Sequence, residues 1–389
     1  MNKPKIRFKG FEGEWNLPSI EDVFEIRNGY TPSKSVESYW IGGTIPWFRM
    51  EDIRASGGFL EDSIQHITPQ AVKNNGLFEK GSIIMATTAT IGVHAQLIAD
   101  SLANQRFTNF LIRKSLRERI IAKYVYYAFF GIDEWAIKNT NSGGLLSVNM
   151  PLLLKQPFFV PSLPEQRAIA SYFTSLDAQI AASTSRLSSL KQIKAASLLN
   201  MFPQKGETVP RVRFKGFQGE WKEIKLGEIF SVEIGEFVIK TKQKNNAPYP
   251  VYNGGVSNTG FYDCYNQEGP KIIVSARGAN AGYVNYCTTD FWAGNSCYSI
   301  GAKNNDELKF FFYFLKRFQE IYMKNQYSAS IPSISKQQIL RTNLIYPSLP
   351  EQRAIASYFT ALDAQITLHR ERLEKLKQIK AACLEKMFA

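Results

Sequence analysis

Cysteine and histidine are scarce in this chain, and their spacing does not suit metal binding. The 389 residues include only four cysteines and three histidines. The cysteines are Cys264, Cys287, Cys297 and Cys383, and no two of them form a C-x-x-C pair. We therefore expect no metal site, no disulfide framework, and reduced thiols of the kind found in the cytoplasm.

Long apolar runs are also missing. The longest, at residues 310–315, is far shorter than the roughly 18–20 residues that a membrane-spanning helix needs. The chain begins MNKPKIRFKG, a basic segment with no apolar run behind it, which argues against a signal peptide. These absences predict a cytoplasmic protein with no membrane partner.

The signatures of common catalytic sites are absent as well. The sequence has no G-x-x-x-x-G-K-[ST] loop, no H-E-x-x-H and no G-x-S-x-G. The segment 246–249, NAPY, approaches the N-P-P-[YFW] motif of adenine methyltransferases. However, Ala247 replaces a proline, and no Gly-rich cofactor loop accompanies the segment. We therefore assign no catalytic residue, and we expect no enzyme activity and no cofactor in this chain.

Positive charge is what the chain has in excess. Lys and Arg number 47 against 34 Asp and Glu, which gives a net charge of +13. Hydrophobic residues make up 44% and aromatic residues 13%, enough to build the core of a folded protein. Because the membrane is set aside, the surplus favours nucleic acid as the anionic partner.

An internal repeat fills the chain. RFKGFEGEW at 7–15 returns as RFKGFQGEW at 213–221, and PSLPEQRAIASYFTSLDAQI at 161–180 returns at 347–366 with one change. LKQIKAA occurs at both 190–196 and 376–382. Each unit of the repeat is therefore a short aromatic segment, a divergent region and a long terminal segment.

The terminal segments predict long helices. Ser162 and Glu165 have the S-x-x-E spacing of a capping box, and an apolar stripe with heptad spacing follows and softens at Lys194 and Lys380. From Pro164 to Met201 such a helix would be about 57 Å long. The residues expected to pack the two helices together are Phe173, Leu176, Ile180, Leu187 and Leu190, with Phe359, Leu362, Ile366, Leu373 and Leu376.

The divergent regions, 17–160 and 224–346, predict two mostly β domains. Short β-branched and aromatic runs alternate with Gly-, Asn- and Pro-containing turns, and one amphipathic helix is expected in each region, at 119–130 and 306–322. Polar side chains on loops and strands can read base edges, while basic ones contact phosphates. The candidate base readers are Thr87, Thr88, Thr90, Asn104, Gln105 and Arg106, then Arg277, Asn280, Asn295 and Ser296. The candidate phosphate contacts are Lys34, Arg49, Lys240, Lys242 and Lys244.

The duplicated RFKGF-x-GEW and PSLPEQRAIASYF segments, each followed by a long helix, resemble the specificity (S) subunit of type I DNA restriction-modification systems. The resemblance covers the whole chain. It implies an α+β fold with two target-recognition domains, each similar to the DNA-reading domain of an adenine methyltransferase. Two long helices packed as an antiparallel coiled coil would join them with pseudo-two-fold symmetry. The implied boundaries are 1–160 and 204–346 for the domains, and 161–203 and 347–389 for the helical regions.

The resemblance also implies a mechanism. Each domain would read one half of a bipartite asymmetric site in double-stranded DNA, and the helices would set the spacer between the halves. The helices would also dock two modification (M) subunits, which methylate adenine N6 with S-adenosylmethionine. Restriction (R) subunits that use ATP and Mg would then direct restriction of unmodified DNA. The chain itself would hold no cofactor.

Two other interpretations remain open from the sequence. One is a stand-alone DNA-binding regulator, and the other is a specificity subunit of a system with a fused methylase-nuclease. The repeat makes a further structural prediction, because the segment before RFKGF at the start of the chain corresponds to the linker at 203–212. We therefore expect Met1 and Ala389 to lie near each other.

Overall fold

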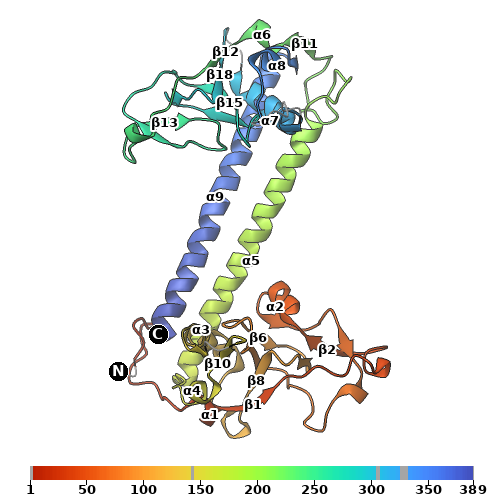
Figure 1. Ribbon diagram of the computed structural model, residues 1–389, viewed down its shortest axis with the longest axis vertical. Coiled ribbons are helices and arrows are strands. Elements are labelled where there is room, and N and C mark those ends of the chain that lie inside the picture. Colours follow the sequence, from red (N-terminus) through yellow and green to blue (C-terminus); the bar gives the residue numbers. More distant parts are fainter. Residues whose placement is uncertain (1–2, 142–143, 304–306, 325–331, 389) are drawn as a thin grey trace. The chain divides into compact units, whose positions relative to one another are not determined.

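The computed structural model describes residues 3–141, 144–303, 307–324 and 332–388. They form two compact units, Met1–Ser183 with Arg372–Ala389 and Thr184–Glu371 (Figure 1). The long helices α5 (Leu163–Asn200) and α9 (Leu349–Phe388) each contribute to both units. The predicted domain boundaries follow the ends of these helices, whereas the two units divide each helix. Among the described residues, no helix is long and apolar enough to cross a membrane.

Unit 1 is built on a five-stranded sheet of order β1-β8-β5-β6-β3, next to a three-stranded sheet of order β4-β2-β7. Its strands are β1 (Phe24–Asn28), β2 (Ile45–Phe48), β3 (Phe59–Leu60), β4 (His66–Ile67), β5 (Ile83–Ala86), β6 (His94–Leu97), β7 (Leu102–Ala103), β8 (Phe107–Ile112), β9 (Thr140–Asn141) and β10 (Ser147–Val148). Its shorter helices are α1 (Ile20–Val23), α2 (Met50–Ser56), α3 (Ala122–Lys138) and α4 (Met150–Leu154).

Unit 2 repeats this plan with a four-stranded sheet, β12-β18-β15-β16, and a three-stranded sheet, β14-β13-β17. Its strands are β11 (Lys222–Lys225), β12 (Phe230–Ile234), β13 (Tyr249–Tyr252), β14 (Gly260–Tyr262), β15 (Lys271–Ser275), β16 (Val284–Cys287), β17 (Trp292–Ala293), β18 (Cys297–Ala302) and β19 (Asn343–Tyr346). Its shorter helices are α6 (Leu226–Ile229), α7 (Leu308–Lys324) and α8 (Lys336–Leu340). The predicted fold class is confirmed.

Every residue of strand β5 is apolar, because the strand is buried on both faces. Successive side chains of a strand point to opposite faces. Ile83 and Met85 belong to the core under α3, while Ile84 and Ala86 belong to a second core with residues of β2. β15 is arranged in the same way in unit 2, where Ile272 enters one core and Ile273 another. A strand buried on both faces therefore reads as a continuous apolar run.

Helix α3 is longer than the sequence predicted. The expected helix ended near residue 130, before Gly131, but α3 continues to Lys138. The reason is that Ile132 and Ala136 extend its buried face beyond that glycine. Gly131 is needed for close packing, because a Cβ there would lie 2.9 Å from the carbonyl oxygen of Phe388.

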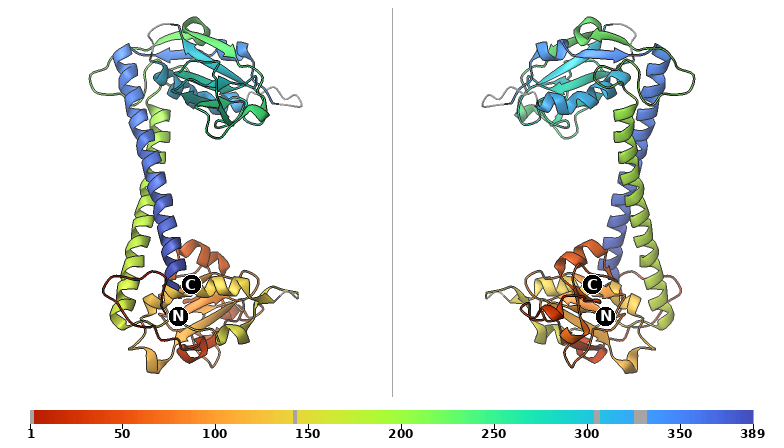
Figure 2. Two further views of the ribbon diagram at one scale, coloured as in Figure 1. Left: turned by 90° about the vertical axis from the view of Figure 1, so that its left-hand side faces the viewer. Right: turned by 90° about the vertical axis from the view of Figure 1, so that its right-hand side faces the viewer.

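Within each unit, the portions of α5 and α9 that belong to it lie side by side (Figures 1 and 2). In unit 1 the rings of Phe173 and Phe388 are 6.4 Å apart, so the start of α5 meets the end of α9. In unit 2 Phe359 stacks on Phe202 at 5.9 Å, so the start of α9 meets the end of α5. The helices are therefore antiparallel in both units. All ten apolar positions expected to pack them together are buried or half-buried.

A buried ion pair attaches the RFKGF segment to the start of α5. Arg7 donates to both carboxylate oxygens of Glu165, each at 2.7 Å, and the Trp15 indole donates to the same carboxylate at 3.1 Å. The Glu165 side chain is 1% exposed. The sequence placed Glu165 in a capping box, and the structure shows that its carboxylate binds the RFKGF segment. Arg213 makes the same two bonds to Glu351 in unit 2, each at 2.7 Å.

The chain termini behave as the repeat suggests, as far as the structure describes them. Met1 and Ala389 lie outside the described residues. The backbone N–H groups of Lys5 and Ile6 donate to the carbonyl of Lys386, at 2.9 and 3.3 Å. The corresponding bond in unit 2 runs from Val212 to the carbonyl of Asn200 at 2.9 Å.

Helix α7 carries a half-buried lysine beneath its sheet. The Lys316 ammonium donates to the carbonyl of Val284 on β16 and to the Gln319 side chain, both at 2.7 Å, and lies 3.9 Å from the Tyr283 ring centre. Burial, with a smaller contribution from the charge of Lys194, lowers the Lys316 pKa to about 8. In unit 1, His94 of β6 lies at the corresponding place, within 2.5 Å of Asp133 on α3.

Replacing Arg7 by Met should lower the free energy of unfolding of unit 1 by about 3 kcal/mol, because a buried carboxylate loses its charged partner. Denaturant unfolding of the full chain measures this. The double variant with Glu165→Gln should recover part of the loss. Arg211→Met, which removes an exposed pair with Glu207, should change the free energy by less than about 1 kcal/mol. A double variant as unstable as Arg7→Met would contradict the assignment.

Lys316 predicts that stability rises with pH above about 8. Its pKa is about 8 in the folded chain and about 10.4 when unfolded, so in this window the unfolded state binds more protons. Buried tyrosines with raised pKa values, such as Tyr322, act in the opposite direction from about pH 10. Denaturant unfolding between these limits should show the rise, and Lys316→Met should reduce it. An equal rise in Lys316→Met and in the exposed-lysine control Lys336→Met would refute the prediction.

Candidate nucleic-acid interface

Three loops of unit 1 meet at the end of β5. The backbone N–H of Thr87 donates to the carbonyl of Arg106 at 3.0 Å. The N–H of Val148 donates to the carbonyl of Thr87 at 2.9 Å, and the N–H of Ala89 donates to the carbonyl of Leu146 at 2.8 Å. These bonds join loops 87–93, 104–106 and 144–148 into a surface that we call the loop junction of unit 1.

Unit 2 has a loop junction with the same main-chain bonds. Ala276 donates to the carbonyl of Ser296 at 2.8 Å, and Ile334 donates to the carbonyl of Ala276 at 2.9 Å. Gly278 donates to the carbonyl of Pro332 at 2.9 Å. The side chains around these bonds differ from those in unit 1. The framework of the junction is therefore kept while its polar surface changes.

A glycine turn closes each junction on another side. A Cβ added to Gly29 would lie 2.2 Å from the carbonyl oxygen of Asn104, and one added to Gly235 would lie 2.2 Å from that of Ala293. Neither position can carry a side chain unless the neighbouring backbone moves.

Ala89 holds a conformation that glycine normally occupies. Its φ is 68°, in the left-handed region, and the corresponding Gly278 has a φ of 88°. This conformation costs an alanine about 1 kcal/mol. Ala89 lies between two of the candidate base readers, Thr88 and Thr90. Its left-handed backbone conformation therefore determines the direction of the chain between them.

The structure brings several predicted DNA contacts of unit 1 to its junction. Gln105 and Arg106 are exposed, and Thr88, Thr90 and Asn104 are half-buried. Thr87 is different: it is 6% exposed and its hydroxyl is hydrogen-bonded to that of Thr108 at 2.8 Å. We therefore correct the assignment of Thr87, which supports the junction and does not present a free side chain to DNA.

In unit 2, Arg277 is exposed at the junction, and Asn280, Asn295 and Ser296 are half-buried. The candidate phosphate contacts of both units lie on other loops. Lys34, Lys240 and Lys242 are exposed and Arg49 is half-buried. Lys244 is ion-paired with Asp263, so part of its charge is already neutralised and it is the weakest of these candidates.

Exposed apolar side chains near the junctions were missed by the sequence reasoning. Leu145 is 68% exposed and Leu146 51% exposed in the loop that bonds Ala89. In unit 2, Phe237 is 73% exposed, just after the glycine turn. Apolar groups contact thymine methyl groups or insert between bases. The available signal was a leucine pair inside a Ser- and Gly-rich loop.

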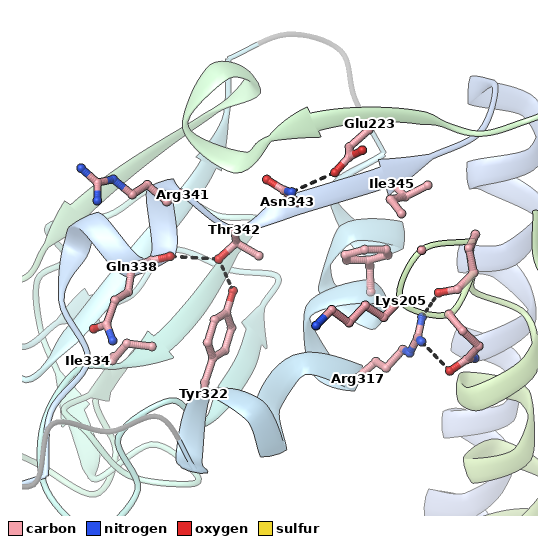
Figure 3. Close-up of a pocket in the computed structure, with 14 residues that line it drawn as sticks. Lys205, Glu223, Arg317, Tyr322, Ile334, Gln338, Arg341, Thr342, Asn343 and Ile345 are labelled. Carbon is pink, nitrogen blue, oxygen red and sulfur yellow. Dashed lines mark hydrogen bonds between the residues drawn. The ribbon is translucent and has the colours of Figure 1, made fainter. Parts of the chain in front are cut away.

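A cavity of about 710 Å³ lies where the linker leaves the end of α5, and Figure 3 shows the residues that line it. Arg317 of α7 donates to the Pro203 carbonyl and, at 2.8 Å, to the Gln204 side chain, so it anchors the linker. Lys205 and Arg341 add positive charge to the lining. Sequence reasoning missed this basic hollow because its residues are far apart in the chain.

Comparison with known proteins supports the interpretation of the repeat. The family described as type I restriction modification DNA specificity domain matches residues 12–192 and again 218–378. The specificity subunit of the type I restriction enzyme EcoprrI of Escherichia coli is 30% identical over 385 residues, which covers 96% of this chain and 92% of that subunit. The MjaIX specificity subunit of Methanocaldococcus jannaschii is 24% identical, with 96% and 92% covered.

Solved structures show the same fold. The crystal structure of the type I restriction-modification S subunit from M. genitalium has a TM-score of 0.68 and 20% identity, and the match covers 100% of this chain and 99% of that one. Two matches to the family in one chain agree with the two units and their duplicated junctions. The chain belongs to the type I restriction-modification DNA specificity family, as a non-catalytic specificity subunit that recognises DNA targets.

Proposed function

We propose that each unit reads one half of a bipartite asymmetric site in double-stranded DNA. The observation that carries this proposal is the loop junction, which occurs once per unit with the same main-chain bonds and different side chains. Two domains that recognise different DNA sequences need the same backbone framework with different polar side chains at the base edges. The net charge of +13 and the exposed lysines on the other loops support phosphate binding beside the junctions.

The helices α5 and α9 set the spacer between the two half-sites and dock two M subunits. Those partners use S-adenosylmethionine to methylate adenine N6, and each takes its target base out of the stack. R subunits, with ATP and Mg, direct restriction of DNA that lacks the methyl groups. No step of this chemistry is assigned to a residue of this chain, which recognises the DNA target.

A modified-base map tests this function. It compares cells that carry this gene and its partner methyltransferase gene with cells that lack this gene alone. We expect N6-methyladenine at a split motif, one adenine per half on opposite strands, and we expect it to vanish without this chain. An unchanged methylation pattern would instead favour a stand-alone DNA-binding regulator.

Single arginines at the two junctions should affect one half-site each. Arg106→Ala should relax base preference in the half read by unit 1, and Arg277→Ala in the other half. Each should cost about 1–3 kcal/mol of specific binding if the guanidinium contacts a guanine edge. Selection of bound sequences from a random DNA library by the complex with M subunits measures both effects. Lys375→Ala, on the exposed face of α9, is the control and should leave both halves unchanged. Loss of preference in both halves from one variant would contradict independent reading.

A further inference from the structure

Three elements of unit 1 meet at one aspartate. The carboxylate of Asp177, on α5, accepts a hydrogen bond from the Tyr127 hydroxyl of α3 at 3.0 Å. Its other oxygen lies 2.6 Å from the ammonium of Lys380 on α9. Lys380 also lies 5.2 Å from the ring centre of Phe130. The aspartate therefore connects the helix of the recognition domain with both long helices.

Unit 2 contains the same contact with the long helices exchanged. Asp363, on α9, accepts a hydrogen bond from the Tyr313 hydroxyl of α7 at 2.9 Å. Its other oxygen lies 2.5 Å from the ammonium of Lys194 on α5. Burial raises the pKa of the Tyr313 phenol, so the hydroxyl remains a donor. We call Asp177–Lys380 and Asp363–Lys194 the register pairs.

The apolar stripe alone does not fix how α5 is aligned with α9. Its positions repeat every seven residues, so a slip of one heptad, about 10.5 Å, would again face apolar side chains with apolar side chains. The charged pairs do not repeat in this way. Seven residues on either side of Asp177 stand Ala170 and Thr184, and seven residues on either side of Asp363 stand Ala356 and Arg370. A slip would therefore remove both partners of the lysines and could place Lys194 against an arginine.

The two pairs require the same alignment. Asp177 and Lys194 are 17 positions apart on α5, and Asp363 and Lys380 are 17 positions apart on α9. An antiparallel pair of helices with equal spacings can therefore close both contacts in one register. The apolar heptad pattern becomes irregular at these two lysines. Their charged groups therefore take part in the contact between the helices, as the ion pairs show.

We propose that the register pairs allow a single antiparallel register of α5 against α9, and so restrict the target to one spacer length. The proposal rests on the proposed function, in which the helices separate the half-sites. A heptad slip of about 10.5 Å corresponds to about three base pairs at 3.4 Å each. The aspartates, lysines and tyrosines of the two contacts are thus positioning residues for DNA recognition, although they do not touch DNA.

The test compares methylation by the complex with M subunits on DNAs whose spacer is shortened or lengthened in steps of one base pair. The neutral variant carries Asp177→Asn, Lys380→Met, Asp363→Asn and Lys194→Met. We expect its methylation at a shifted spacer, relative to the best one, to exceed that of the unchanged chain about tenfold, because the charge-assisted contacts no longer select one register. The exchanged variant, with Asp177→Lys, Lys380→Asp, Asp363→Lys and Lys194→Asp, should restore a single spacer.

Matched controls separate register from general stability. Replacing Glu374 and Lys377, an exposed pair within α9 at 3.3 Å, by Gln should leave the spacer profile unchanged. A neutral variant with the unchanged profile would overturn the proposal. If the neutral variant does not fold, the exchanged variant decides, because a broadened profile there would also overturn it.

A second readout does not depend on the proposed function. Cys383 of α9 lies beside Tyr172 of α5, with sulfur and hydroxyl oxygen 3.6 Å apart. In a chain with Cys264→Ser, a short bismaleimide should link Cys383 to Tyr172→Cys but not to Gln179→Cys, one heptad further along. In the neutral variant the Gln179→Cys link should appear, and its absence there would overturn the proposal even if no split motif is methylated.

Discussion

In each unit, one buried carboxylate binds an arginine and so fixes the RFKGF segment to the start of a long helix. Glu165 and Glu351 begin the long helices, and each is 1% exposed. A desolvated carboxylate is tolerated only when a cation reaches it with good geometry. Arg7 and Arg213 supply that cation from segments more than 130 positions away. The RFKGF segment is thereby fixed to the helix start, and the strands between them are enclosed as one domain.

The two pairs are not identical in strength. In unit 1 the Trp15 indole adds a third hydrogen bond to the carboxylate. In unit 2 the indole N–H of Trp221 is buried and finds no partner among the residues that the structure describes. A buried donor without a partner is unfavourable, so unit 2 depends more heavily on its arginine. The repeated sequence thus forms two contacts that differ in their hydrogen bonds.

Sequence reasoning was strongest where the chain repeats itself. The heptad stripe, the 38-residue length of α5 and the two mostly β regions all followed from periodicity and from duplicated segments. It failed where function depends on contacts between distant residues. The capping-box spacing did not reveal the partner of Glu165, because no local pattern in the sequence indicates that Arg7 binds its carboxylate. Thr87 resembled a polar loop residue in the sequence. Its hydroxyl is instead hydrogen-bonded to that of Thr108 on the neighbouring strand β8, a contact that the sequence does not reveal. The exposed Phe237 was missed because a single apolar residue in a loop sequence does not show whether its side chain is buried.

The central claim is that each unit reads its own half-site through its own loop junction. The most direct measurement is a methylation map for a chain in which residues 224–346 are replaced by a second copy of residues 17–160. Both junctions would then carry the side chains of unit 1, on helices that are unchanged. The account predicts methylation at an inverted repeat of the half-site that unit 1 reads, with the spacer preserved. Methylation that still contains the original second half-site would show that its recognition lies outside residues 224–346 and would contradict the account.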